Sequence, residues 1–215
     1  MKGIIALILF FLSSTIQRLF VTILGIKEIT NFNAVILNFS SSFIILVCLT
    51  FLYKKELKKE WNIFKKKLAD NMDIGLKYWL LGLAGMMVSN IALSIIFQND
   101  GADNEQLVQQ MITALPILMV FSAGFIAPIV EEITFRKVFR DNIKKDILFI
   151  LVSGIFFGFL HVFPADNLGQ FLYIIPYSSL GISFAMMYQK TNTVFTSISM
   201  HMMHNTILTL LSILV

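Results

Sequence analysis

Apolar runs of about twenty residues recur along the whole chain and constrain its fold more than any other feature. A helix of about 20 apolar residues crosses a hydrocarbon core about 30 Å thick. Because 57% of the 215 residues are hydrophobic and 14% are charged, no room is left for a separate soluble domain. We predict a single all-α domain over 1–215, a polytopic membrane bundle of about seven transmembrane helices. The expected helices cover 3–25, 34–53, 74–98, 107–140, 147–163, 168–188 and 194–215.

The distribution of lysine and arginine predicts the orientation of these helices. Basic residues mark cytosolic loops. If the N-terminus is cytosolic, every Lys and Arg except Arg18 and Lys27 falls on the cytosolic side. The apolar start lacks a cleavage site, so we expect a retained first helix rather than a signal peptide. The Lys/Asn/Ile/Phe-rich composition favours a bacterial cytoplasmic membrane as the location.

The net charge of +4 is mostly this orientation signal and does not indicate nucleic-acid binding. Much of it lies in segment 54–67, where apolar residues recur at helical spacing between lysines. The segment could lie on an anionic membrane surface, or form a solvated loop that fixes topology. Both interpretations are open on the sequence alone. Cys48 is the only cysteine, so no internal disulfide can form.

Three charged residues, Glu131, Glu132 and Arg136, lie within the apolar segment 107–140. A side chain such as Asp or Arg costs about 2.5 to 3.5 kcal/mol at the centre of a membrane helix. Residues four apart share a helix face, so Glu132 is expected to pair with Arg136, while Glu131 points about 100° away and stays available for proton transfer. A purely structural ion pair is the alternative.

Two prolines divide the same segment. Because 107–140 is too long for one span, Pro116 is expected to separate a short interfacial piece from the spanning helix. Pro128 has no N–H, so it should free the carbonyl of Gly124 and kink the helix, which would re-aim Glu131.

Histidines supply further polar positions inside expected helices. His161 lies well inside one helix, and alone it indicates no more than a hydrogen bond between helices. Ser197, His201 and Asn205 recur every four residues and form one polar face of the last helix. His204 lies about 60° round from His201 and is expected beside the same site.

These residues form three motifs, in a fixed order and on three separate expected helices. The motifs are Glu131-Glu-x-x-x-Arg136, Phe157-x-x-x-His161 and His201-x-x-x-Asn205. Together they resemble the motifs of the CAAX-protease and bacteriocin-processing family, which includes the eukaryotic Ras-converting enzyme. The resemblance covers a motif-bearing core of about 107–210, whereas the first hundred residues are similar only as generic membrane helices.

The resemblance implies an intramembrane endopeptidase that hydrolyses peptide bonds near the termini of membrane-associated proteins or leader-bearing peptides. It implies that Glu131 and His161 activate water and that His201 and Asn205 stabilise the oxyanion. Glu132 and Arg136 would support them. Amide hydrolysis requires a base for water and donors for the oxyanion, so these residue types suit the reaction.

The cofactor is left open between none and a divalent metal such as zinc. Glu131, His161 and His201 could form a three-ligand zinc site, but the chain has no His-Glu-x-x-His motif and no cysteine pair. We favour metal-independent catalysis, although the family has also been described as metal-dependent.

Other functions are compatible with a membrane bundle. The main alternative is a non-catalytic bacteriocin-immunity or scaffold protein of the same fold, and another is a transporter with Glu131 and His161 as a proton relay. A rhomboid-like nucleophile fits worse, and Ser153-Gly154 is better explained as a small-residue helix contact. The expected partners are membrane lipid and a substrate that is either a prenylated C-terminal tetrapeptide protein or a leader-bearing peptide such as a bacteriocin.

Overall fold

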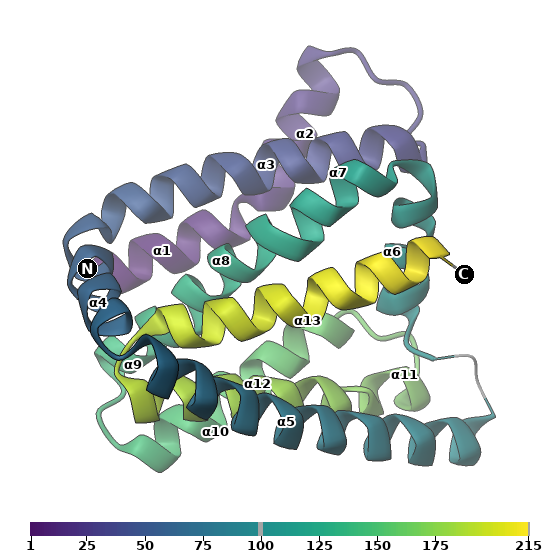
Figure 1. The fold of residues 1–215 in the computed structure, drawn as a ribbon. Helices are drawn as coiled ribbons and strands as arrows, with labels where there is room; N and C mark the ends of the chain where they lie inside the picture. The colour runs from purple at the N-terminus through teal and green to yellow at the C-terminus, as the bar shows by residue number, and fades with distance from the viewer. Residues whose placement is uncertain (99–100, 215) are drawn as a thin grey trace.

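The computed structural model describes residues 1–98 and 101–214, and helices are the only regular secondary structure in these ranges (Figure 1). Two short π-helical turns, η1 and η2, interrupt the α-helices. The elements are α1 Lys2–Phe11, α2 Ser13–Ile23, α3 Asn31–Leu52, α4 Lys54–Lys66, α5 Leu68–Phe97, α6 Asp103–Ala114, α7 Pro116–Phe121, η1 Ser122–Ile126, α8 Ala127–Glu132, η2 Ile133–Lys137, α9 Val138–Asn142, α10 Asp146–Val162, α11 Leu168–Leu172, α12 Ile174–Thr191 and α13 Val194–Leu214.

The expected all-α membrane bundle is confirmed. In the described ranges four helical stretches are long and apolar enough to cross a membrane, and the pair α1–α2, bent by 45°, would make a fifth. Helix α10 is apolar but only 17 residues long, and α13 is longer but carries the polar face at 197–205. The count of seven spans therefore stays a prediction. The four stretches are Asn31–Leu52, Leu68–Phe97, Pro116–Asn142 and Leu168–Thr191.

Pro116 divides the long fourth segment as predicted. Helix α6 ends at Ala114, Leu115 leaves helical geometry with ψ of 74°, and Pro116 begins α7. Proline suits this position because the first N–H of a helix has no intrahelical partner. From Pro116 to Asn142 the chain stays helical, but η1 and η2 lie directly before and after α8. Each π turn changes which side chains face the bundle, so α8 is rotated relative to its neighbours.

Small residues allow α12 to pack closely against α10 and α5. A Cβ atom on Gly154 of α10 would lie 2.6 Å from the backbone nitrogen of Ile182 in α12. On α5, a Cβ atom on Gly82 would lie 2.7 Å from the Cβ atom of Ser183. The predicted small-residue contact at Ser153-Gly154 is therefore confirmed.

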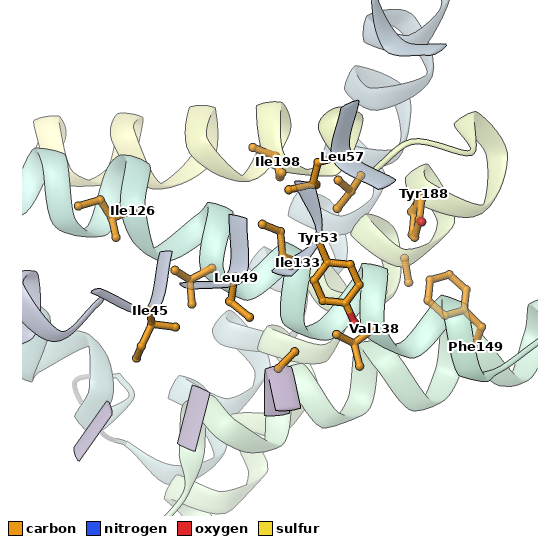
Figure 2. Packing of buried hydrophobic residues seen from close by; sticks show 14 residues of the cluster. Ile45, Leu49, Tyr53, Leu57, Ile126, Ile133, Val138, Phe149, Tyr188 and Ile198 are labelled. Atoms are coloured by element: carbon orange, nitrogen blue, oxygen red, sulfur yellow. The ribbon is translucent and has the colours of Figure 1, made fainter. Parts of the chain in front are cut away.

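Helix α4 packs on one end of the bundle, so segment 54–67 is not a solvated loop. Its residues Leu57 and Phe64 are buried, while its lysines are exposed. Figure 2 shows Leu57 close to Ile198 of α13 within a buried apolar cluster that also draws on α3, α8, α10 and α12. The labelled members are Ile45, Leu49, Tyr53, Leu57, Ile126, Ile133, Val138, Phe149, Tyr188 and Ile198. Contact between the lysine face and lipid stays a prediction.

Candidate active site

A cavity of about 910 Å³ lies between α5, α6, α8, α10, α12 and α13 and is lined by most of the sequence-predicted site residues. Glu131 of α8, His161 of α10 and His201 with Asn205 of α13 all line it, as does His204. The predicted supporting residues Glu132 and Arg136 lie behind the wall, with side chains that are completely buried. The fold thus separates the two adjacent glutamates, as helical geometry predicted.

Glu132 forms the predicted ion pair with Arg136, with 3.2 Å between Oε2 and Nε. Its other carboxylate oxygen, Oε1, lies 3.1 Å from Nδ1 of His201. The sequence did not indicate this second contact, because 69 residues separate the two positions and no spacing rule links α8 to α13. Glu132 therefore orients a motif histidine as well as neutralising the arginine.

Arg136 is held by three further groups. Its NH1 group donates to Oγ of Ser153 at 2.9 Å and to the Ser153 carbonyl at 3.3 Å. The Ser153 hydroxyl in turn donates to the carbonyl of Phe135 at 2.6 Å. The guanidinium also lies over the ring of Phe157, 4.8 Å from its centroid. Sequence analysis missed the role of Ser153, and the chain offers no local signal for it.

His201 lies between the two glutamates. Its Nδ1 is bonded to Glu132, and its Nε2 lies 3.9 Å from Oε2 of Glu131. An ionised carboxylate can only accept, so Nδ1 carries a proton and donates it to Glu132. The ring also stacks on Phe184, with 4.8 Å between ring centroids. These contacts fix the ring with Nε2 directed at Glu131.

His161 is oriented by its own helix. Its Nδ1 lies 2.9 Å from the carbonyl oxygen of Phe157, which can only accept a hydrogen bond. In the neutral ring Nδ1 therefore carries the proton and Nε2 is an acceptor. The ring stacks on Tyr177 of α12 at 4.8 Å and lies 4.3 Å from the Phe157 ring. His161 thus contributes a proton acceptor to the cavity.

Asn205 is held by the π turn η1. Its Nδ2 donates to the carbonyl oxygen of Ala123 at 2.9 Å. The N–H of Ala127 donates to Ser122, five residues back, so in the same register Pro128 stands opposite Ala123 and has no N–H to offer. The sequence analysis expected the free carbonyl at Gly124, and the acceptor that Asn205 uses is one residue earlier because the turn is π-helical.

His204 also lines the cavity, on the side of α5. The indole Nε1 of Trp79 donates to Nδ1 of His204 at 3.4 Å. The protonated nitrogen of a neutral His204 ring is then Nε2. The expectation that His204 lies beside the same site is therefore confirmed.

The residues present do not fit the zinc site that the sequence left open. Over residues 1–98 and 101–214, no three His, Cys, Asp or Glu side chains are grouped closely enough to hold a metal ion. We derive no step through a metal.

Several buried atoms of the site have no hydrogen-bond partner, and one of them belongs to Glu131, which lines the cavity. Oε2 of Glu131 is buried, yet it has no hydrogen-bond partner in the described structure. A buried carboxylate oxygen without a partner costs free energy, and such a cost is usually offset by a bound molecule or by function. The Glu131 side chain as a whole lines the cavity and is 19% exposed.

Comparison with known proteins agrees with the three motifs. Residues 113–207 match the family described as type II CAAX prenyl endopeptidase Rce1-like. The chain is 27% identical over 115 residues to the Bacillus subtilis protein named "Putative membrane peptidase YdiL", covering 52% of this chain and 44% of that protein. No solved structure matches.

Two further relatives carry no description of activity. An uncharacterised protein of Mycoplasma capricolum is 35% identical over 71 residues, 32% of this chain and 21% of that protein. The Lactococcus lactis "UPF0177 protein YxdF" is 23% identical over 148 residues, 66% of this chain and 80% of that protein. The chain thus spans less than half the length of the first two of these three relatives.

Proposed function

We propose that this chain is a member of the CAAX-protease and bacteriocin-processing family and an intramembrane endopeptidase that acts through water, a proposal supported by the match of residues 113–207 and by the similarity to a putative membrane peptidase. The observation that carries the proposal is Glu131, which lines the cavity and holds a buried oxygen without a hydrogen-bond partner 3.9 Å from Nε2 of His201. A base and a donor side by side in a cavity inside an apolar bundle are what amide hydrolysis requires.

The proposed reaction begins with a water molecule held by Glu131 and by the free nitrogen of His161. Glu131 takes one proton as the water oxygen adds to the substrate carbonyl carbon, which leaves the carbonyl oxygen negatively charged. That proton then passes to the amide nitrogen as the C–N bond breaks. The products are a carboxylic acid and an amine, so atoms and charges balance.

The proposed donors for the negative oxygen are Nε2–H of His201 and an N–H of Asn205. Asn205 uses one N–H on Ala123 and keeps the second for the cavity. Nε2 of His201 can donate only when it carries a proton in addition to the one on Nδ1. The resulting imidazolium would lie beside the Glu131 carboxylate, which stabilises its positive charge. Removal of one donor to an oxyanion typically costs about 10²- to 10³-fold in kcat.

Replacement of the base tests this function. We expect Glu131→Gln to lower the cleavage of a quenched fluorogenic peptide by about 10²- to 10⁴-fold, because the amide cannot accept the water proton. The assay uses the purified full chain in lipid nanodiscs. Asp73→Asn is the matched control, since Asp73 is an exposed acid outside the cavity.

Three outcomes bear on the assignment. Turnover by Glu131→Gln equal to wild type would reject Glu131 as the base. Loss of turnover in Asp73→Asn would show that the assay follows folding rather than chemistry. If the wild-type chain cleaves no peptide but protects cells against a bacteriocin, the non-catalytic immunity function is the correct one.

The substrate classes suggested by the family are a membrane-anchored protein cut near its C-terminus and a leader-bearing peptide. Chelation followed by assay tests the cofactor. We expect activity to survive treatment with a zinc chelator, and loss of activity that added zinc restores would contradict the metal-independent mechanism.

A further inference from the structure

The charge of the cavity wall is uneven. It carries two carboxylates, Glu131 beside the motif histidines and Glu105 of α6, and no Lys or Arg among its described lining residues. A group that binds a substrate carboxylate is normally a cation or a cluster of backbone N–H groups. The wall therefore favours positive over negative charge in whatever occupies it.

Glu105 is connected to the catalytic residues through Tyr177. The Tyr177 hydroxyl is hydrogen-bonded to the Glu105 carboxylate, and the ring of the same tyrosine stacks on His161 at 4.8 Å. Asn104 donates to the same hydroxyl at 3.4 Å. These contacts hold the Glu105 carboxylate beside the part of the wall formed by Tyr177 and His161.

Within residues 1–98 and 101–214, no cationic side chain pairs with the Glu105 carboxylate. Although Glu105 is exposed along the cavity, partial burial raises the pKa of its carboxyl, and the hydrogen bond from Tyr177 only partly opposes this effect. No charged group contributes to the shift in the described part of the chain. A cation bound there would offset the cost of burying the carboxylate.

The remaining wall combines uncharged polar side chains with flexible apolar ones. Met86, Met87, Met111 and Met119 line it, together with leucine and isoleucine side chains. Methionine is unbranched and flexible, so a wall rich in it accommodates apolar side chains of different shapes. An extended peptide could bury apolar side chains against this wall, and the wall would accept more than one peptide sequence.

We propose that the substrate is an apolar peptide segment that carries a Lys or Arg side chain or an α-amino group, which binds to Glu105 while the scissile bond lies at Glu131. The inference rests on the proposed endopeptidase function and narrows its substrate class. A segment that ends in a free carboxylate at the cut site is disfavoured, because two glutamates and no Lys or Arg would face it. Cleavage of a leader-bearing peptide away from its C-terminus fits this wall better than cleavage next to a free C-terminal carboxylate.

A peptide series tests the proposal on the full chain in nanodiscs. The probes are quenched fluorogenic peptides with one apolar core, each carrying a single Lys, Gln or Glu at successive positions, and ending in either an amide or a free carboxylate. We expect the KM of the best Lys peptide to be on the order of tenfold below that of its Gln counterpart. We expect Glu105→Gln to remove that preference, and Glu105→Lys to transfer it to the Glu peptides.

Asp103→Asn is the matched control, since Asp103 is an exposed acid two residues away whose side chain does not line this cavity. Fluorescence anisotropy of the same peptides with the Glu131→Gln variant measures the preference for Lys over Gln in binding, without cleavage. If Lys and Gln peptides bind equally, or if free-carboxylate peptides are preferred, the substrate class is wrong. A Lys preference in binding without cleavage by the wild-type chain would support the Glu105 site and reject the peptidase function instead.

Discussion

At the scale of single residues, burial gives two adjacent glutamates different chemistry. Glu132 is completely buried and is bonded to Arg136 and to His201, so its charge is used in structure. Glu131, one residue earlier, faces the cavity with an unpartnered oxygen. Burial of an ion pair costs desolvation free energy even when further hydrogen bonds are made. Removal of one partner lowers the stability of the protein more than replacement of both partners by apolar residues.

Removal of one partner of the buried pair should therefore destabilise the protein. We expect Arg136→Ala to lower the free energy of unfolding by about 3 to 5 kcal/mol and to abolish turnover, because it leaves the buried Glu132 carboxylate without its arginine. Glu132→Gln should also lower both stability and turnover, since it leaves the Arg136 charge unpaired. Thermal unfolding in detergent, together with the peptide assay, measures both effects.

The exposed pair Lys77 and Asp73 provides the control, because it has the same i, i+4 spacing with 2.6 Å between Nζ and Oδ2. Lys77→Ala should cost at most about 0.5 kcal/mol. If Arg136→Ala and Glu132→Gln both unfold like wild type and lose only turnover, the pair supports catalysis but not the fold.

At the scale of elements, α4 holds the beginning of α13, the helix that carries the proposed oxyanion donors. The Glu60 carboxylate accepts a hydrogen bond from the backbone N–H of Val194 at 2.8 Å and from the Tyr188 hydroxyl at 2.9 Å. It also lies 3.3 Å from Nζ of Lys137. A carboxylate at a helix N-terminus accepts a hydrogen bond from a free N–H and interacts favourably with the positive end of the helix dipole. Glu60 thus acts as a cap supplied by another helix.

Loss of this cap should weaken the attachment of α13. We expect Glu60→Ala to lower the free energy of unfolding by about 2 to 3 kcal/mol, since hydrogen bonds to a charged group are lost. Turnover should fall too, because α13 carries His201 and Asn205. Glu60→Gln should be milder, as an amide oxygen still accepts from Val194.

Glu56→Ala on the same helix is the matched control, because Glu56 pairs with Lys2 in a more exposed position. Its cost should stay within about 1 kcal/mol. Equal stability of the Glu60 and Glu56 variants would contradict the role of Glu60 as a cap.

At the scale of the whole molecule, α13 spans the distance between two chemically different ends. Glu60 on lysine-rich α4 contacts its first residue, whereas Gln109 of α6 donates to the carbonyl of Ser212 near its other end (Figure 1). Eighteen helical steps cover roughly 27 Å, close to the thickness of a hydrocarbon core. Because the cavity wall includes His201 and continues to Ser212, the cavity extends away from the lysine-rich end.

This arrangement predicts the side from which substrate enters. If the lysine-rich end is cytosolic, as the distribution of basic residues predicts, the α6 end of the cavity faces the outside. In a Cys48→Ser background, Gln109→Cys in intact bacterial cells should react with a membrane-impermeant maleimide, whereas exposed Lys66→Cys on α4 should react only after lysis. If Lys66→Cys reacts in intact cells and Gln109→Cys does not, the orientation of the protein in the membrane is the opposite of the predicted one.

Sequence spacing predicted local relations well and distant ones poorly. The Glu132–Arg136 pair, the break at Pro116 and the contact at Gly154 each follow from helix periodicity or from the size of one residue. The bend between α1 and α2 and the register of η1 were not predicted, because each depends on how a helix packs against its neighbours. Glu60 was missed, since its partner Val194 is 134 positions away.

The sequence by itself determined that this chain is an all-helical membrane protein and which side chains are costly enough to matter, because burial of charge in an apolar environment is unfavourable wherever the chain folds. Only the tertiary structure decided which nitrogen of His201 is bonded to Glu132, that Ala123 holds Asn205, and that Glu105 shares a cavity with Glu131. These relations join residues on different helices, and helix packing, rather than spacing along the chain, sets the distances between them.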